Sequence, residues 1–208
     1  MSRTSPTDLL VLHAVRLRGM AGNAAVARRF GLDPAAAEEL LLDAEACGWV
    51  TWSEFAGVGG WSLTGRGRAE NERRLAAELA DVPGGAAAVR RVHDAFLPLN
   101  ARLRQACTDW QIRPAPGAPL AANAHDDPEW DSLIVCELSG LAGELAPLAA
   151  ELAGVLDRFG GYDVRFSSAV ERAGAGDPSW VDGTGVDSCH TVWFELHEDL
   201  IASLGIER

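Results

Sequence analysis

The sequence predicts a mainly helical protein in two parts: an N-terminal winged helix, made of three helices and a two-stranded wing, followed by an all-helical domain of four helices. Three short segments before residue 48 carry apolar residues at helical spacing. Two short runs rich in aromatic and β-branched residues, separated by a glycine-rich turn, then indicate a hairpin. The remaining segments carry only helical patterns. With 208 residues, 48% of them hydrophobic, the chain is long enough for a packed core.

Capping signals position the first three helices. Ser5 as cap, Pro6 in the first turn and Asp8 as an early acid predict a helix that Gly19 ends. A second short helix is expected over residues 21–30. Asp33 should cap the third helix, which begins at Pro34 and ends before Gly48, a C-cap glycine.

The hairpin and a fourth helix complete the first part. Residues 49–55 and 61–63 are expected as strands, joined by a turn over 56–60. Thr64 should cap a helix over residues 65–80. Three helices followed by a two-stranded wing define a winged helix, so a winged helix-turn-helix domain is expected over residues 1–80.

A break over residues 81–85 separates this domain from an all-helical effector and dimerisation domain over residues 86–208. Its helices, plausible as a helical bundle, are expected over residues 86–111, 127–159, 162–173 and 188–204. Residues 113–125 and 174–185 are expected as loops. Pro98 and Pro147 should kink or interrupt the two long helices.

Charge is distributed unevenly along the chain. The net charge is −12; residues 1–75 carry nine Arg and nine acids, whereas residues 76–208 carry nine Arg and twenty-one acids. The acidic second part is therefore not expected to lie along nucleic acid or an anionic membrane. No signal peptide and no apolar run of membrane-spanning length is evident, and the four Cys are widely scattered. We expect a cytoplasmic protein with reduced thiols and no membrane partner.

The third helix conflicts with a simple DNA-binding interpretation. It carries Glu38, Glu39, Asp43 and Glu45 and no Arg, Lys, Asn or Gln. Phosphate contact needs Arg or Lys, and base reading needs Arg, Asn or Gln. The candidate phosphate-binding side chains lie instead around this helix, and they are Arg16, Arg28, Arg29, Arg66 and Arg68. The alternative interpretation is that these arginines form an ordinary solvated face.

Residues 8–79 resemble MarR-type winged helix-turn-helix transcriptional regulators. The matching residues are Gly31-Leu32-Asp33 before the third helix, Gly48-Trp49-Val50, and Trp61-Ser62-Leu63-Thr64 followed by Gly65-Arg66-Gly67-Arg68. The resemblance implies a homodimer, operator binding and repression that responds to a ligand. The acidic helical extension resembles one found with such modules in actinobacteria.

A candidate effector pocket combines the last helix with the first long helix. His190, Trp193 and His197 should share one helical face, and the full set of candidate ligand-binding residues is His93, Phe96, Asn100, His190, Trp193 and His197. A pair of structural histidines is the alternative. Residues 100–111 and 123–131 hold further polar and aromatic groups, among them His125 and Asp131, which we interpret as cap and loop chemistry.

No catalytic motif, metal site or cofactor is expected. None of the five His lies three or four residues from another, and Cys189 next to His190 is poorly placed for a nucleophile and its base. The leading hypothesis is a transcriptional regulator that binds DNA and senses a small molecule. The alternatives are a winged-helix scaffold for a protein-interaction or accessory role without DNA, and a small-molecule-binding enzyme that uses the His190/His197 helix.

Overall fold

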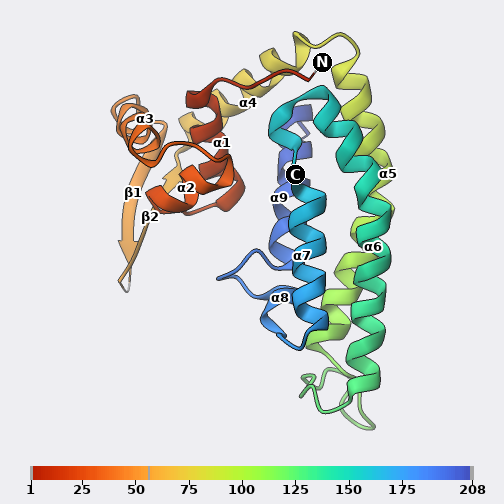
Figure 1. The fold of residues 1–208 in the computed structure, drawn as a ribbon. Coiled ribbons are helices and arrows are strands. Elements are labelled where there is room, and N and C mark those ends of the chain that lie inside the picture. Colours follow the sequence, from red (N-terminus) through yellow and green to blue (C-terminus); the bar gives the residue numbers. More distant parts are fainter. Residues whose placement is uncertain (1, 56, 207–208) are drawn as a thin grey trace. The chain divides into compact units, whose positions relative to one another are not determined.

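The computed structural model describes residues 2–55 and 57–206. It is mainly helical, with one small two-stranded antiparallel sheet (Figure 1). The chain forms two compact units. The first comprises Met1–Val89, Val155–Arg158 and Glu198–Arg208, and the second comprises Arg90–Gly154 and Phe159–His197. The first unit thus recruits two short segments from late in the chain, which chain order alone does not reveal.

The first unit follows the predicted element order. Its elements are α1 (Thr7–Arg18), α2 (Asn23–Arg29), α3 (Pro34–Ala46), β1 (Val50–Phe55), β2 (Val58–Leu63) and α4 (Gly65–Ala80). The second strand begins at Val58, earlier than predicted, because the register pairs Phe55 with Val58 and leaves a very short turn. Position 56 of the predicted turn lies outside the described residues.

Two of the three predicted N-caps are confirmed. The Asp33 carboxylate accepts a hydrogen bond from the Ala36 N–H at 2.9 Å, and the Thr64 hydroxyl accepts one from the Gly67 N–H at 3.0 Å. The predicted Ser5 cap is wrong: α1 begins one residue later, with Pro6 in the cap position and no side-chain cap. Asp8 instead accepts from the Leu9 N–H within the first turn.

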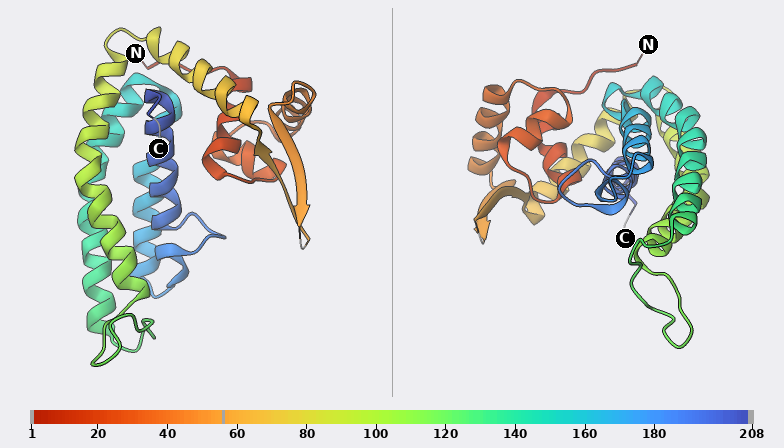
Figure 2. Two further views of the ribbon diagram at one scale, coloured as in Figure 1. Left: turned by 180° about the vertical axis from the view of Figure 1, so that it is seen from behind. Right: turned by 60° about the horizontal axis from the view of Figure 1, so that its bottom comes forward.

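The hairpin packs on the three small helices through one face. Trp52 pairs with Trp61 across the strands, and the Trp61 indole N–H donates to Asn23 on α2 at 2.7 Å. Trp61 and Val50 join a buried cluster with apolar residues of α1, α2 and α3. Strands β1 and β2 extend beyond these helices (Figure 2).

The second unit is built from helices, several of which also contribute residues to the first unit. They are α5 (Gly85–Gln111), α6 (Pro128–Val155), the short 3-10 helix η1 (Asp157–Phe159), α7 (Tyr162–Gly174), α8 (Ser179–Asp182) and α9 (Cys189–Leu204). The prediction placed a loop over 174–185 and missed α8, which has only four residues. Pro98 and Pro147 lie inside α5 and α6.

Helices α5 and α6 run antiparallel and are joined by ion pairs. Arg102 binds Glu137 and Glu144 at 2.7 and 2.6 Å, and Arg91 binds Glu151 at 2.6 Å. Both carboxylates raise the pKa of the Arg102 guanidinium. The irregular segment after α5 extends past the ends of both helices (Figure 2).

The expectation that no apolar run reaches membrane-spanning length needs correction. By length and composition alone, α6 is apolar enough to cross a membrane, because an 18-residue window within it has a mean hydropathy of 1.5. Of this window, 28% is buried inside the structure. The sequence reading missed this run because isolated acids interrupt it. On α4 and α5, Leu75, Leu79 and Val92 are buried within the chain, Leu75 against Leu9 and Ala202.

The start of α4 depends on a close approach that only glycine allows. A Cβ at Gly67 would lie 1.8 Å from the backbone oxygen of Trp49, whereas one at Gly65 would meet nothing within 4 Å. We therefore expect Gly67→Ala to lower the free energy of unfolding by about 3 kcal/mol, the upper range for overpacking. Gly65→Ala is the matched control and should change it by less than about 1 kcal/mol. Urea denaturation of both variants measures the difference, and equal stabilities would contradict the packing described for the start of α4.

Candidate functional site

The predicted phosphate-binding arginines fall into different environments. Arg28 and Arg66 are exposed. Arg29 is partly buried, and its guanidinium lies over the Phe30 ring, 4.4 Å from the ring centroid. Arg68 is 56% exposed, but one of its nitrogens lies 3.6 Å from the Glu198 carboxylate. Two of the five predicted side chains are thus plainly open to a solvent-borne phosphate.

Arg16 is a correction to the predicted set. Its side chain is 5% exposed, and it donates to Glu198 at 2.9 Å and to Glu72 at 2.8 Å. Two carboxylates already occupy this guanidinium inside the first unit, so it is not available to DNA phosphates. Sequence reasoning missed this because Glu198 lies 182 residues away along the chain.

A second buried ion-pair network lies next to the first. The Asp199 carboxylate is fully buried and accepts hydrogen bonds from His13 at 3.0 Å and from the Arg158 guanidinium. Arg158 also donates to Glu78 at 2.9 Å and to the Ser203 hydroxyl at 2.8 Å. These contacts join α1, α4, η1 and α9 within the first unit. Because a buried charge is costly unless it is paired, the network fixes these four segments together.

The state of His13 follows from its surroundings. Burial lowers the pKa of the imidazole, against the opposing effect of Asp199, so the neutral ring is favoured. Its Nε2 then donates to Asp199, and its Nδ1 needs a donor. The Asn71 side chain lies 3.4 Å from Nδ1. Turning the Asn71 amide so that its nitrogen faces Nδ1 supplies that donor, because amide oxygen and nitrogen have the same shape.

The exposed face of α3 is acidic. The side chains of Glu38, Glu39, Asp43 and Glu45 are all exposed, whereas Ala37, Leu41 and Ala44 are buried against the first-unit core. The helix therefore presents carboxylates outward, as its sequence pattern predicts. Leu42 stands among them with 53% of its surface exposed.

The predicted ligand-binding residues of α5 and α9 are largely brought together, with one exception. Phe96 stacks on Trp193 with ring centroids 4.8 Å apart, and His197 lies 5.4 Å from Phe96 and 6.3 Å from His93. The Trp193 indole N–H donates to Asn100 at 3.1 Å. His190 is exposed and lies against Phe194, so it does not share the buried face of Trp193. A ligand at this cluster stays a prediction.

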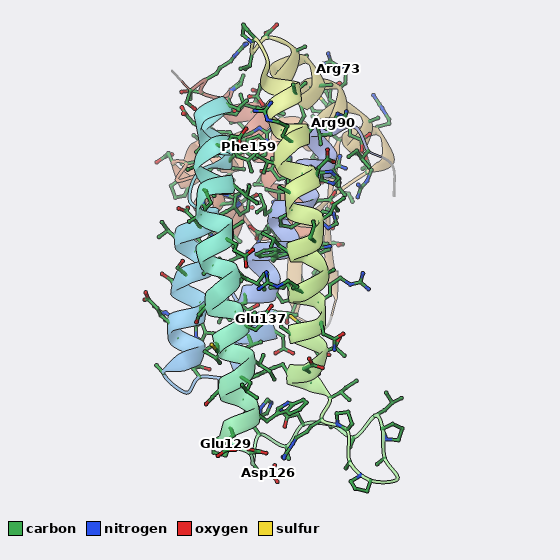
Figure 3. The ribbon with its side chains drawn as sticks, turned by 90° about the vertical axis from the view of Figure 1, so that its right-hand side faces the viewer. Arg73, Arg90, Asp126, Glu129, Glu137 and Phe159 are labelled. Carbon is green, nitrogen blue, oxygen red and sulfur yellow. The ribbon has the colours of Figure 1, made fainter. Side chains whose placement is uncertain are left out.

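A cavity of about 410 Å³ lies at the other end of the second unit, where α5 ends and α6 begins. Its lining comes from four segments, which are Trp110 on α5, His125 on the following loop, Pro128, Asp131, Ser132 and Val135 on α6, and residues around Gly174 at and after the end of α7. Figure 3 shows Asp126 and Glu129 at this end of α6 and Glu137 farther along the helix. A neighbouring cavity of about 350 Å³, lined by Arg102, lies farther along α5 and α6.

Three polar side chains are bound to one another at the larger cavity. His125 Nδ1 lies 3.0 Å from Asp131, Asn123 donates to Asp131 at 3.0 Å, and the His125 ring lies 4.5 Å from the Trp110 ring. The sequence reading assigned cap chemistry to this cluster. That is right for Asp127, which accepts from the Glu129 and Trp130 N–H groups, and for Asp131, an acid of the first turn of α6 that in addition binds His125. The sequence signal for this contact was weak: His125 precedes Asp131 by six residues, with the start of α6 between them.

Cys107 and Cys189 are both buried. Burial raises the pKa of Cys107 to about 11 and that of Cys189 to about 12, so both stay protonated near neutral pH. Within residues 2–55 and 57–206, no group of three or more His, Cys, Asp or Glu side chains is arranged to hold a metal ion.

Comparison with protein-family models, with curated proteins and with solved structures gave no match to this chain. Functional inference therefore rests on the residues and their geometry.

The buried His13–Asp199 pair predicts loss of stability in acid. The pKa of His13 is lowered from 6.5, so the unfolded chain binds a proton first and stability falls as pH drops below about 6.5. Burial opposes ionisation of Asp199, but Arg158 and His13 outweigh it and hold the pKa of Asp199 below 3.8, which adds a second loss under more acidic conditions.

Urea unfolding between pH 8 and pH 5 measures this dependence. His13→Gln should flatten the slope between about pH 6.5 and 5, because it removes the titrating ring. His190→Gln, at an exposed histidine, should leave the slope unchanged. A wild-type protein whose unfolding free energy rises as the pH falls over this range would contradict the assignment of a neutral His13.

Proposed function

We propose that the first unit is a winged helix that contacts a protein through α3 and the hairpin, and that it does not bind DNA. The order α1, α2, α3, β1, β2 and α4, with α2 and α3 in contact, is the element order of a winged helix-turn-helix. In such modules the helix in the position of α3 enters the major groove. The proposal therefore depends on what α3 presents.

The acidic outward face of α3 is the observation that carries this proposal. Glu38, Glu39 and Asp43 are exposed there, and no basic residue accompanies them. Two like charges 4 Å apart repel by about 1 kcal/mol in bulk water and about 4 kcal/mol near a protein surface. Docking this face against phosphates would sum such repulsions, whereas DNA binding normally derives much of its affinity from released counterions.

Exposed apolar groups beside the acids favour a protein partner. Leu42 is 53% exposed on α3, and Trp52 is 43% exposed on β1. The Trp52 ring lies against Gly59, where a Cβ would come within 2.6 Å of its ring. Exposed aromatic side chains held in a fixed orientation are typical of protein interfaces. Charge complementarity therefore assigns the partner a basic surface with apolar groups.

A DNA-binding regulator remains the alternative function. The exposure of Arg28 on α2 and of Arg66 at the start of α4 favours it, because both arginines face solvent. In that case the cluster around Phe96 and Trp193, or another site in the second unit, would receive the effector.

Fluorescence anisotropy with a labelled duplex from the chain's own upstream region separates the two functions. We expect no binding by wild-type protein at micromolar concentration in about 50 mM salt. Proteins that bind DNA without sequence specificity have a Kd of about 10⁻⁴–10⁻⁶ M at physiological salt, and they bind more tightly at this lower salt concentration. The triple variant Glu38→Arg, Glu39→Arg and Asp43→Arg should bind, with an affinity that falls steeply with salt. The control is Asp94→Arg, Glu129→Arg and Glu171→Arg, which makes the same net charge change on exposed acids of the second unit and should not bind.

A photo-reactive residue at position 42 tests for the partner in cells. We expect one dominant protein adduct, which disappears when Glu38 and Asp43 are changed to Arg, and none from the same residue at the exposed position 69 of α4. DNA binding by the wild-type chain, or adducts that do not depend on the α3 charges, would overturn the proposal.

A further inference from the structure

The cavity at the end of α5 has the construction of a small-molecule site. Its volume of about 410 Å³ falls within the range of ligand pockets, about 300–1,000 Å³. The lining includes the Trp110 indole, 5% exposed, together with Val135, Ala173 and Pro178. Its polar side chains are His125, Asp131 and Ser132, and the first two are bound to each other. All of these residues belong to the second unit, so the site is independent of the proposed protein contact.

The hydrogen bonds around Asn123 fix the orientation of its amide. Its Oδ1 accepts from the His125 backbone N–H at 3.1 Å. Its Nδ2 donates to the Trp110 carbonyl and to Asp131 Oδ1, both at 3.0 Å. An amide nitrogen carries two hydrogens, and these two acceptors use both. The 3.2 Å approach of Nδ2 to His125 Nδ1 is therefore a contact without a shared proton.

The proton on His125 follows from this count. His125 Nδ1 receives no hydrogen from Asn123, and it lies 3.0 Å from Asp131 Oδ2, which can only accept when ionised. Nδ1 therefore carries the proton and donates it to Asp131. In the neutral ring the other nitrogen, Nε2, is then a bare acceptor. A carboxylate that orients a histidine in this way is the arrangement that holds one tautomer in place.

The backbone of His125 has an uncommon conformation. His125 has a φ of 54°, the only positive value outside glycine among the described residues. Positive φ in a residue with a Cβ is uncommon, although Asn, Asp and His adopt it more readily than most. The strain persists because Asn123 binds the His125 N–H and the ring is fixed between Trp110 and Asp131.

We propose that this cavity binds a neutral, planar aromatic molecule that carries a hydroxyl or N–H group. The flat ring packs among the apolar lining groups beside Trp110, and the hydroxyl or N–H donates to His125 Nε2. Asp131 already accepts from Asn123 with one oxygen and from His125 with the other. Asp126, Asp127 and Asp131 surround this end of α6 and disfavour an anionic ligand, although Arg113 pairs with the first two.

The probe is 2-naphthol, titrated into ¹⁵N-labelled full-length protein. We expect saturable shifts of the backbone amides of Asp131, Gly174 and Gly176, which line the cavity. The control ligand 2-methoxynaphthalene keeps the ring and lacks the donor, so its Kd should be about five- to tenfold higher. Negatively charged 2-naphthoate should bind more weakly than 2-naphthol.

His125→Asn removes the acceptor while keeping a residue that tolerates positive φ. It should raise the Kd for 2-naphthol about tenfold and abolish the preference over the methyl ether. Asp131→Asn tests the same hydrogen bond without changing the imidazole, and it should weaken the preference as well. His190→Asn, at an exposed histidine, should change neither.

Three results would overturn the proposal. These are no saturable shift with 2-naphthol at millimolar concentration, equal affinity for the methyl ether in the wild-type protein, and shifts that centre on Leu133 and Ile134 of the neighbouring cavity. Because none of these measurements involves α3, their failure leaves the proposed protein contact untouched.

Discussion

Two adjacent carboxylates near the end of α9 organise the first unit. Glu198 and Asp199 are buried, and a buried carboxylate loses several kcal/mol of hydration that only paired cations and hydrogen bonds can offset. The partners come from other segments: Arg16 pairs with Glu198, and Arg158 and His13 bind Asp199. This requirement explains why the first unit includes residues 155–158 and 198–208 together with the N-terminal segments. Within residues 7–80, helices α1 and α4 bind these carboxylates and Arg158 directly, whereas α2, α3 and the hairpin pack through the apolar cluster.

The same pairing bears on function. Arg16 would otherwise be a natural cation beside a DNA-reading helix, but its guanidinium is directed inward and neutralised by Glu198 and Glu72. The outward face of α3 meanwhile carries carboxylates. Part of the positive charge of the unit is therefore paired with buried carboxylates. The outward face of α3 carries negative charge, whereas the helix that enters the DNA groove normally carries positive charge. Element order and turn residues, on which the sequence-based expectation of DNA binding depended, do not determine surface charge.

Local signals predicted most of the fold, and long-range polar contacts escaped prediction. Asp33 and Thr64 marked helix starts because a cap acts within three residues. Ser5 failed because the neighbouring Pro6 took the cap position. The His13–Asp199 contact spans 186 residues, so nothing local distinguishes it from two unrelated polar residues. At the cavity, His125 and Asp131 are six residues apart, but only the loop that brings His125 over the start of α6 makes them partners. Sequence reasoning therefore found the polar cluster without recognising its geometry.

Native-state hydrogen exchange in Asp199→Asn tests most directly whether this carboxylate holds the first unit together. The account predicts that the most protected amides of α1 and α4 lose about 3–5 kcal/mol of protection, the effect of breaking a buried ion pair, because Arg158 is left buried and undercompensated. Asp94→Asn, at an exposed acid of α5, should leave them unchanged. Undiminished protection of α1 and α4 in Asp199→Asn would contradict the central role assigned to the buried carboxylates of α9.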